Sequence, residues 1–148
     1  MKFLLLPLLL SSLALPSLAQ TRPKAKSKAK PKTTAAIPAA TLARGAVVYK
    51  NVCLTCHQAD GYGVPNLNPP LIKTGYVLGP KPRLIGIVLR GLPGPIEING
   101  DEYKQPMPAQ AYLTDAQVAD VLTYVRNAFG NRAGAVGEVE VKAVRAAK

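Results

Sequence analysis

Both cysteines of this 148-residue chain and its single histidine lie together in the segment Cys53-Leu54-Thr55-Cys56-His57. Two thiols at this spacing can add to the two vinyl groups of one haem, and a histidine directly after the second thiol is placed to ligate the iron. The motif therefore predicts that Cys53 and Cys56 attach one haem c covalently. It also predicts that His57 is an axial ligand of the iron.

Three other interpretations of the motif stay open. A thioredoxin-like dithiol needs a strand before the motif and a helix after it, whereas a helix is expected before it here and Gly61-Tyr62-Gly63 follows. A structural zinc needs four ligands, and the chain offers three with no other Cys or His. A plain disulfide suits an exported chain but leaves His57 without a role.

A six-coordinate haem needs a second axial ligand, and the chain has no second histidine. Apart from Met1, the only methionine is Met107, in the segment Gln105-Pro106-Met107-Pro108. A lone methionine is often a core residue. Two flanking prolines, however, favour a stiff loop that holds a weak thioether ligand at a set distance. We therefore predict that Met107 is the second ligand.

The chain divides into four segments. Lys2, the apolar run after it and the sequence Ser17-Leu18-Ala19 predict a secretory signal peptide that is cleaved after Ala19. Its apolar run is too short and too interrupted for a membrane-spanning helix. The four predicted segments are the signal peptide at 1–19, a basic Lys/Ala/Pro-rich disordered linker at 20–40, a folded domain at 41–131 and a C-terminal extension at 132–148.

Charge gives little information about function. The formal net charge is +11, and the linker contributes six basic residues and no acid. It is either a solvated spacer or an arm that makes weak contact with a membrane surface or an acidic partner. Nucleic acid is an unsuitable partner for an exported chain. Asp60, Glu97, Asp101 and Glu102 lie in expected loops without a paired base, so they are predicted surface charges and not catalytic groups.

Local patterns predict three helices. Apolar residues at helical spacing indicate a helix over about 41–51, and a second amphipathic helix is expected to begin at Pro82 and stop at Gly91. Thr114 and Gln117 form a capping box for a third helix, which is expected to end at Gly130.

The remaining segments are poor in periodicity. The Gly- and Pro-rich stretch 61–82 is expected to be loop, and 95–104 a small hairpin around Asn99-Gly100. Three valines in the tail fit either a strand or a short helix. Long loops and few aromatic residues predict a thin core, so we expect a bound group to complete it.

On these residues the chain resembles class I c-type cytochromes, which are monohaem with a His/Met-ligated iron. The resemblance covers about 41–130. It rests on Gly45 and Tyr49 in the first helix, the Cys/His motif, the Pro69-Pro70-Leu71 loop, Met107 and the segment Leu122-Thr123-Tyr124-Val125-Arg126. It implies an all-α fold, namely a small cytochrome c fold of three to five helices wrapped around one covalent haem, with long loops and one small β-hairpin. In that family the two terminal helices cross, with a small residue against aromatic ones.

The resemblance implies three further features. A backbone carbonyl of the proline loop, assigned to Pro69, is expected to accept a hydrogen bond from the second ring nitrogen of His57 and so to fix its tautomer. Tyr103 is expected either to approach a haem propionate or to be a plain surface tyrosine. The segment from Gly94 to Met107 is similar to that of a bacterial subset associated with periplasmic dehydrogenases.

The implied function is that of a monomeric periplasmic electron carrier and not an enzyme. Such a carrier cycles between Fe(II) and Fe(III), accepts from a dehydrogenase or respiratory complex and donates to an oxidase or reductase. One alternative is a haem subunit held in a dehydrogenase or reductase complex. Another is an open-site haem sensor or enzyme, if Met107 does not ligate. A haem-free thiol redox module is the third.

Overall fold

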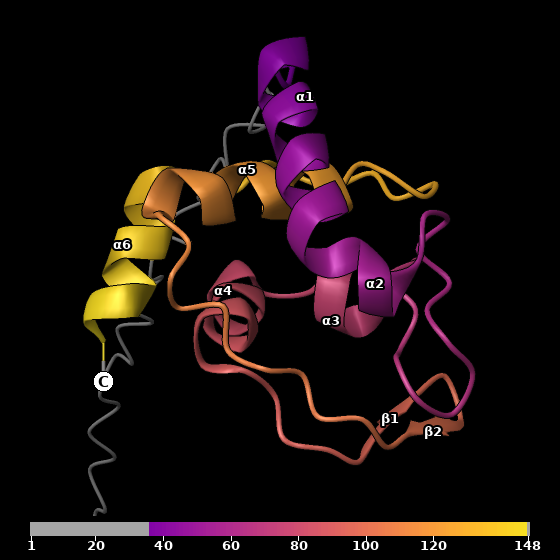
Figure 1. Ribbon diagram of the computed structural model, residues 1–148. Helices are drawn as coiled ribbons and strands as arrows, with labels where there is room; N and C mark the ends of the chain where they lie inside the picture. Colours follow the sequence, from indigo (N-terminus) through magenta and orange to yellow (C-terminus); the bar gives the residue numbers. More distant parts are fainter. Residues whose placement is uncertain (1–35, 148) are drawn as a thin grey trace, which may run out of the picture. The chain divides into compact units, whose positions relative to one another are not determined.

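The computed structural model describes residues 36–147, so the predicted signal peptide and most of the basic linker lie outside the described residues. In chain order the elements are α1 (Ala39–Val48), a π-helical turn η1 (Tyr49–Cys53), α2 (Leu54–His57), α3 (Gly75–Leu78), α4 (Lys81–Arg90), β1 (Ile96–Ile98), β2 (Asp101–Tyr103), α5 (Asp115–Val125) and α6 (Glu138–Ala146) (Figure 1). Because α1, η1 and α2 are continuous, this part of the chain has five helices and one hairpin. The expected all-α fold is confirmed.

The N-terminal helix is longer than its pattern predicts. It begins at Ala39, inside the segment predicted as linker, and it continues through η1 and α2 to His57. The sequence suggested that the Cys/His motif follows the helix. In the structure the motif instead forms the last residues of the helix. A π-helical turn such as η1 often marks a functional site. The helix stops where Gln58 adopts a positive φ of 62°.

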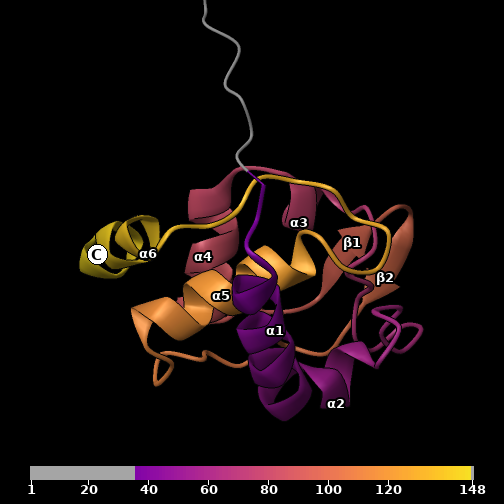
Figure 2. The same cartoon turned by 90° about the horizontal axis from the view of Figure 1, so that it is seen from above.

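Helices α1 and α5 cross at close range (Figure 2). Gly45 lies at the crossing, because a Cβ at this position would overlap the backbone oxygen of Asp120 and the Cβ of Tyr124. Beside the crossing, the rings of Tyr49, Tyr124 and Phe129 pack with centroids 5.3, 5.5 and 5.9 Å apart. The resemblance implied a small residue packed against aromatic residues where the two terminal helices cross. Gly45 beside Tyr49 and Tyr124 matches this arrangement.

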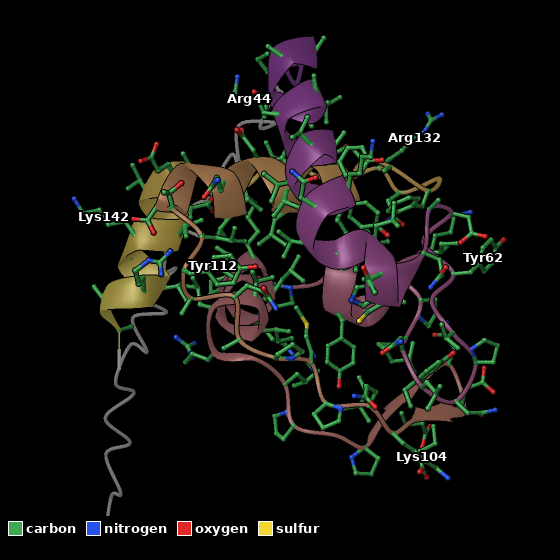
Figure 3. All side chains as sticks on the ribbon, in the orientation of Figure 1. Arg44, Tyr62, Lys104, Tyr112, Arg132 and Lys142 are labelled. Atoms are coloured by element: carbon green, nitrogen blue, oxygen red, sulfur yellow. The ribbon has the colours of Figure 1, made fainter. Side chains whose placement is uncertain are left out.

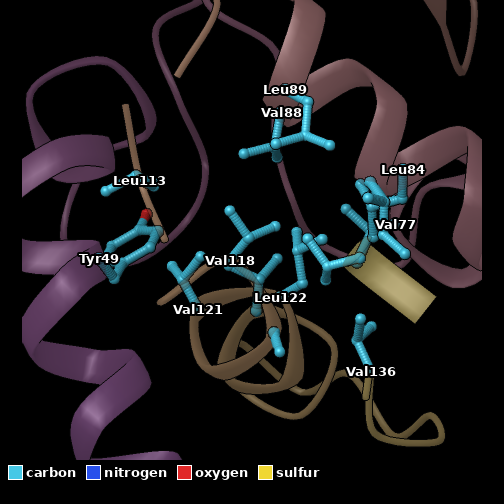
Figure 4. Packing of buried hydrophobic residues seen from close by; sticks show 14 residues of the cluster. Tyr49, Val77, Leu84, Val88, Leu89, Leu113, Val118, Val121, Leu122 and Val136 are labelled. Atoms are coloured by element: carbon cyan, nitrogen blue, oxygen red, sulfur yellow. The ribbon is translucent and has the colours of Figure 1, made fainter. Parts of the chain in front are cut away.

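The apolar core lies between α4 and α5 (Figure 4). The apolar side chains of α5 are buried, with Val118 fully enclosed. The capping box is confirmed, because the Thr114 hydroxyl accepts from the Gln117 backbone N–H at 3.2 Å and the Gln117 side chain accepts from the Thr114 N–H at 2.9 Å. Local hydrogen bonding therefore fixes where α5 begins.

The end of α5 differs from the prediction. The helix ends at Val125, and Gly130 ends only the turn that follows, where Phe129 and Gly130 have φ values of 57° and 76°. The side-chain amide of Asn131 donates to the carbonyl of Val125 at 2.8 Å and to that of Leu71 at 2.9 Å. This amide satisfies a terminal carbonyl of the helix, so the helix can stop early.

Between residues 75 and 104 the structure mostly agrees with the helix and the hairpin that the sequence predicted. Helix α4 begins at Lys81, one residue before Pro82, and ends as predicted before Gly91. Strands β1 and β2 form the expected antiparallel hairpin, with positive φ at both Asn99 and Gly100, as a type I′ turn requires. The short helix α3 was not predicted, because four residues are too few to show a period.

The C-terminal extension adopts the helical alternative. Val141 of α6 is completely buried, and α6 packs against α4 and α5. Two ion pairs attach α6 to the rest of the domain, Lys81 with Glu140 at 3.0 Å and Arg145 with Asp115 at 2.7 Å. Within the described range, no helix has the length and apolar character that crossing a bilayer requires.

Candidate functional site

A large apolar cavity is lined by the Cys/His motif, the proline loop, α4, α5 and the segment that contains Met107. The space between these side chains, including its open mouth, is about 1130 Å³. Its walls are mainly aliphatic, with Leu84 and Val88 from α4 and Val121, Leu122 and Val125 from α5. A concave apolar space with few polar groups is the usual form of a cofactor site.

The motif residues Cys53, Cys56 and His57 all line this cavity. No disulfide joins Cys53 to Cys56. Burial, with a smaller contribution from Cys56, raises the pKa of the Cys53 thiol to about 11. A redox-active dithiol needs a lowered thiol pKa, and a helix precedes the motif where a thioredoxin-like unit needs a strand. The site therefore does not suit a thioredoxin-like reaction.

The imidazole of His57 is oriented by the proline loop. Its Nδ1 lies 3.0 Å from the carbonyl oxygen of Pro69, the residue to which the resemblance assigned this contact. With the proton on Nδ1, the ring donates to Pro69 and Nε2 keeps a free lone pair. Burial lowers the pKa of His57, and the carbonyl contact opposes that shift. A neutral ring in this tautomer is the form that binds a metal.

Two backbone interactions hold the segment containing Met107. Met107 and Leu92 exchange hydrogen bonds of 2.9 and 3.0 Å, and the N–H of Gln110 donates to the carbonyl of Val88 at 2.8 Å. These bonds fix the segment against the C-terminal end of α4 and its following residues. Met107 lines the same cavity as His57. The two predicted ligands therefore border the same space.

Tyr103 is not the plain surface tyrosine of the second alternative, and a different tyrosine, Tyr76, lines the cavity. Tyr103 is 7% exposed in the hairpin and is not among the cavity-lining residues. Tyr76, in a segment expected to be loop, lines the cavity, and the guanidinium of Arg83 lies 4.0 Å from its ring centroid. No periodicity or motif around Tyr76 indicated this placement.

The four acids that the sequence placed on the surface are exposed, as predicted: Asp60, Glu97, Asp101 and Glu102. The last three lie in the hairpin strands and not in loops. Among the described residues, no three His, Cys, Asp or Glu side chains are grouped so that they could hold a metal ion by themselves. The donors that the cavity offers are instead two thiols, one imidazole and one thioether. Two thiols that can be attached covalently, two predicted iron ligands and a large apolar space fit a haem c.

The sequence comparisons agree with this site. The profile of the Cytochrome c family matches residues 42–129. Cytochrome c-552 of Thermus thermophilus is 37% identical over 117 residues, covering 72% of this chain and 87% of the relative. The chain also matches the cytochrome c subunit of an alcohol dehydrogenase (quinone) of Gluconacetobacter polyoxogenes, 32% identical over 120 residues, covering 76% of this chain but only 23% of that subunit.

A third relative is the gluconate 2-dehydrogenase cytochrome c subunit of Pantoea cypripedii, 41% identical over 96 residues, which cover 62% of this chain and 21% of that subunit. The chain is a member of the cytochrome c family, a family of haem proteins that transfer electrons. Its cofactor is haem c, attached covalently, and Cys53 and Cys56 are at the spacing that this attachment requires.

Proposed function

We propose that this chain is an exported one-electron carrier of the periplasm, with thioether links at Cys53 and Cys56 and with His57 and Met107 as axial ligands. The observation that carries the proposal is that His57, oriented by Pro69, and Met107 border one apolar cavity. When bound, the haem supplies an iron that changes between Fe(II) and Fe(III). A His/Met ligand pair and an apolar environment both favour the reduced form and a higher reduction potential.

Each residue of the site has a specific task in this proposal. The two cysteines retain the cofactor, and the Pro69 carbonyl directs Nε2 of His57 toward the iron. The aliphatic side chains of α4 and α5 exclude water from the cavity and so keep the local dielectric constant low. Tyr76 contributes a phenol to the cavity wall, and Tyr103 stays the proposed contact of a haem propionate. None of these tasks requires a catalytic acid or base, so the proposed protein is not an enzyme.

The proposed partners are redox proteins. A dehydrogenase or respiratory complex is the donor, and an oxidase or reductase is the acceptor; the carrier is monomeric, and its basic linker makes at most weak contact with a membrane surface. The similarity to dehydrogenase cytochrome subunits favours a second candidate, a haem subunit held in such a complex. Purification from the periplasm at moderate salt separates the two, because only the second candidate remains attached to its partner.

The ligand assignment is tested with visible spectra. Haem that stays with the chain after acid–acetone extraction establishes the covalent link, and a weak far-red band of the ferric protein indicates a methionine ligand. We expect Met107→Ala to keep the covalent haem, lose the far-red band, lower the reduction potential and bind CO when reduced. Lys104→Ala is the matched control, because this exposed side chain projects away from the hairpin (Figure 3).

The control protein should have the wild-type spectrum and resist CO. If Met107→Ala keeps the far-red band, Met107 is not the ligand. If the wild-type protein itself lacks the band and binds CO, the open-site sensor or enzyme is the better assignment. A colourless exported protein would leave only the haem-free alternatives.

A further inference from the structure

The C-terminal helix α6 contacts the segment that follows Met107 through one side chain. The guanidinium of Arg145 donates to the carbonyl of Ala111 at 2.9 Å and to that of Leu113 at 2.7 Å, and it pairs with the carboxylate of Asp115 at 2.7 Å. All three acceptors lie within five consecutive residues, between Met107 and the first turn of α5. Arg145 therefore fixes the path of this segment from outside the cavity.

The contact completes the attachment of the Met107 segment. Leu92 holds Met107 itself, and Val88 holds Gln110, both through backbone hydrogen bonds. Beyond Gln110 the chain leaves α4 and reaches the start of α5 at Asp115, and Arg145 bonds to this stretch. Leu113 in the same stretch is 5% exposed and lines the cavity. Movement of this stretch would therefore reach both the cavity wall and Met107.

We propose that Arg145 is a positioning residue for the Met107 ligand, acting from the C-terminal extension through the segment 111–115. The inference rests on the proposed ligation by Met107. A thioether is a weak ligand. The fraction of molecules in which Met107 is bound to the iron therefore depends on how strongly the protein disfavours an open arrangement, in which the Met107 segment has moved away from the cavity. Contacts made only in the closed arrangement shift this equilibrium toward ligation. Arg145 supplies three such contacts.

The guanidinium is suited to this task because its donors form a planar, rigid fork. One donor reaches the Asp115 carboxylate while two others reach separate carbonyls, which a single ammonium group cannot reproduce. The side chain of Arg145 is 34% exposed and that of Asp115 is 20% exposed, so water screens the charge pair in part. The expected effect is therefore moderate in size and specific to the Met107 segment.

The test uses the ferric holoprotein and imidazole, which competes with the methionine for the iron. We expect Arg145→Ala to bind imidazole about tenfold more tightly than the wild type, because a larger open fraction raises the apparent affinity in proportion. Arg145→Lys should show an increase of about threefold, since it keeps the ion pair but loses the fork. Both variants should have a weaker far-red band, with unchanged haem content.

Lys81→Ala is the matched control. It removes the ion pair between Lys81 and Glu140, which joins α6 to the start of α4 and not to the Met107 segment. We expect its imidazole affinity to stay within about twofold of the wild type, as a surface pair predicts. Wild-type affinity in Arg145→Ala would overturn the proposal. An equal increase in Lys81→Ala and Arg145→Ala would overturn it as well, because general loosening of α6 would then explain the effect.

The wild-type protein reports separately on the proposed function. If it has the far-red band and binds imidazole weakly, Met107 ligation stands, and the variants alone decide the role of Arg145. If it binds imidazole as tightly as Met107→Ala does, the ligand assignment fails, and the role of Arg145 fails with it.

Discussion

Arg126 is a buried cation whose guanidinium donates to backbone carbonyls. The residue is 5% exposed, and its guanidinium donates to the carbonyl oxygens of Val77, Gly79 and Gly134. Burial lowers the pKa of this guanidinium, and the nearby Glu140 carboxylate opposes the shift. A single side chain on α5 therefore joins α3, the turn after it and the segment that leads to α6.

We expect Arg126→Met to lower the free energy of unfolding of the holoprotein by about 3 kcal/mol, because the buried carbonyls lose their donors. Arg126→Lys should cost about 2 kcal/mol, since one ammonium cannot reach acceptors on separate segments. Denaturant unfolding followed by circular dichroism gives these values. Arg132→Met is the control, because this exposed side chain points outward (Figure 3) and should change stability by about 0.5 kcal/mol or less. Equal values for Arg126→Met and Arg132→Met would contradict the buried role.

At the scale of residues, the sequence predicted the members of the candidate site that lie in one motif or are the only remaining residue of their type. The two cysteines and His57 lie in one motif, and Met107 was identified because no other methionine or histidine remained. Tyr76 and Arg145 could not be found in this way. Their positions depend on contacts across the fold, and Arg145 meets Asp115 thirty positions away in the chain. Neither residue lies in a pattern that distinguishes it from surface residues of the same type.

At the scale of elements, the crossing of α1 and α5 depends on a missing side chain. The groups that a Cβ at Gly45 would meet belong to the α5 backbone and to the first side-chain atom of Tyr124, so neither can rotate away. Alanine would gain about 1 kcal/mol in helix propensity, but the overlap can be relieved only by separating the helices. The aromatic cluster beside the crossing would separate with them.

We therefore expect Gly45→Ala to lower the free energy of unfolding by about 2 kcal/mol despite its better helix propensity. Denaturant unfolding of the holoprotein measures it. Gly75→Ala is the matched control, because nothing lies within 4 Å of a Cβ at that position, and its effect should stay within about 1 kcal/mol. A stabilised Gly45→Ala protein would mean that the helices are not in close contact at this point.

Elements were predictable where a short local code defines them. The capping box fixed the start of α5, and the Asn99-Gly100 turn fixed the hairpin, because these signals act within a few residues. The end of α5 was wrong because the side chain of Asn131, from beyond the turn, satisfies the Val125 carbonyl. The predicted helix of about 41–51 ended inside η1, and its continuation to His57 was missed. The motif side chains face the cavity for chemical reasons and so hide the helical period.

At the scale of the whole molecule, the domain is organised around a space that protein atoms do not fill. The cavity between the motif, α4, α5 and the Met107 segment measures about 1130 Å³ with its mouth. An empty apolar cavity in a core destabilises a protein in proportion to its volume, and a typical domain has only about 5–15 kcal/mol of stability in all. The sequence predicted a thin core. Because the apolar side chains do not fill the interior by themselves, the cofactor must complete it.

We expect the chain without covalent haem to lose its tertiary structure. In Cys53→Ala/Cys56→Ala both points of attachment are removed, and the cavity walls then have to collapse or take up water. The variant should have a smaller far-UV helical signal, no cooperative thermal transition and strong binding of a hydrophobic dye, as expected when packing is lost. Thr55→Ala, an exposed change within the same motif, should keep the haem and the cooperative transition. If the double variant is free of haem yet melts cooperatively with the wild-type helical signal, then the protein core is sufficient by itself, and the haem contributes to function but not to the fold.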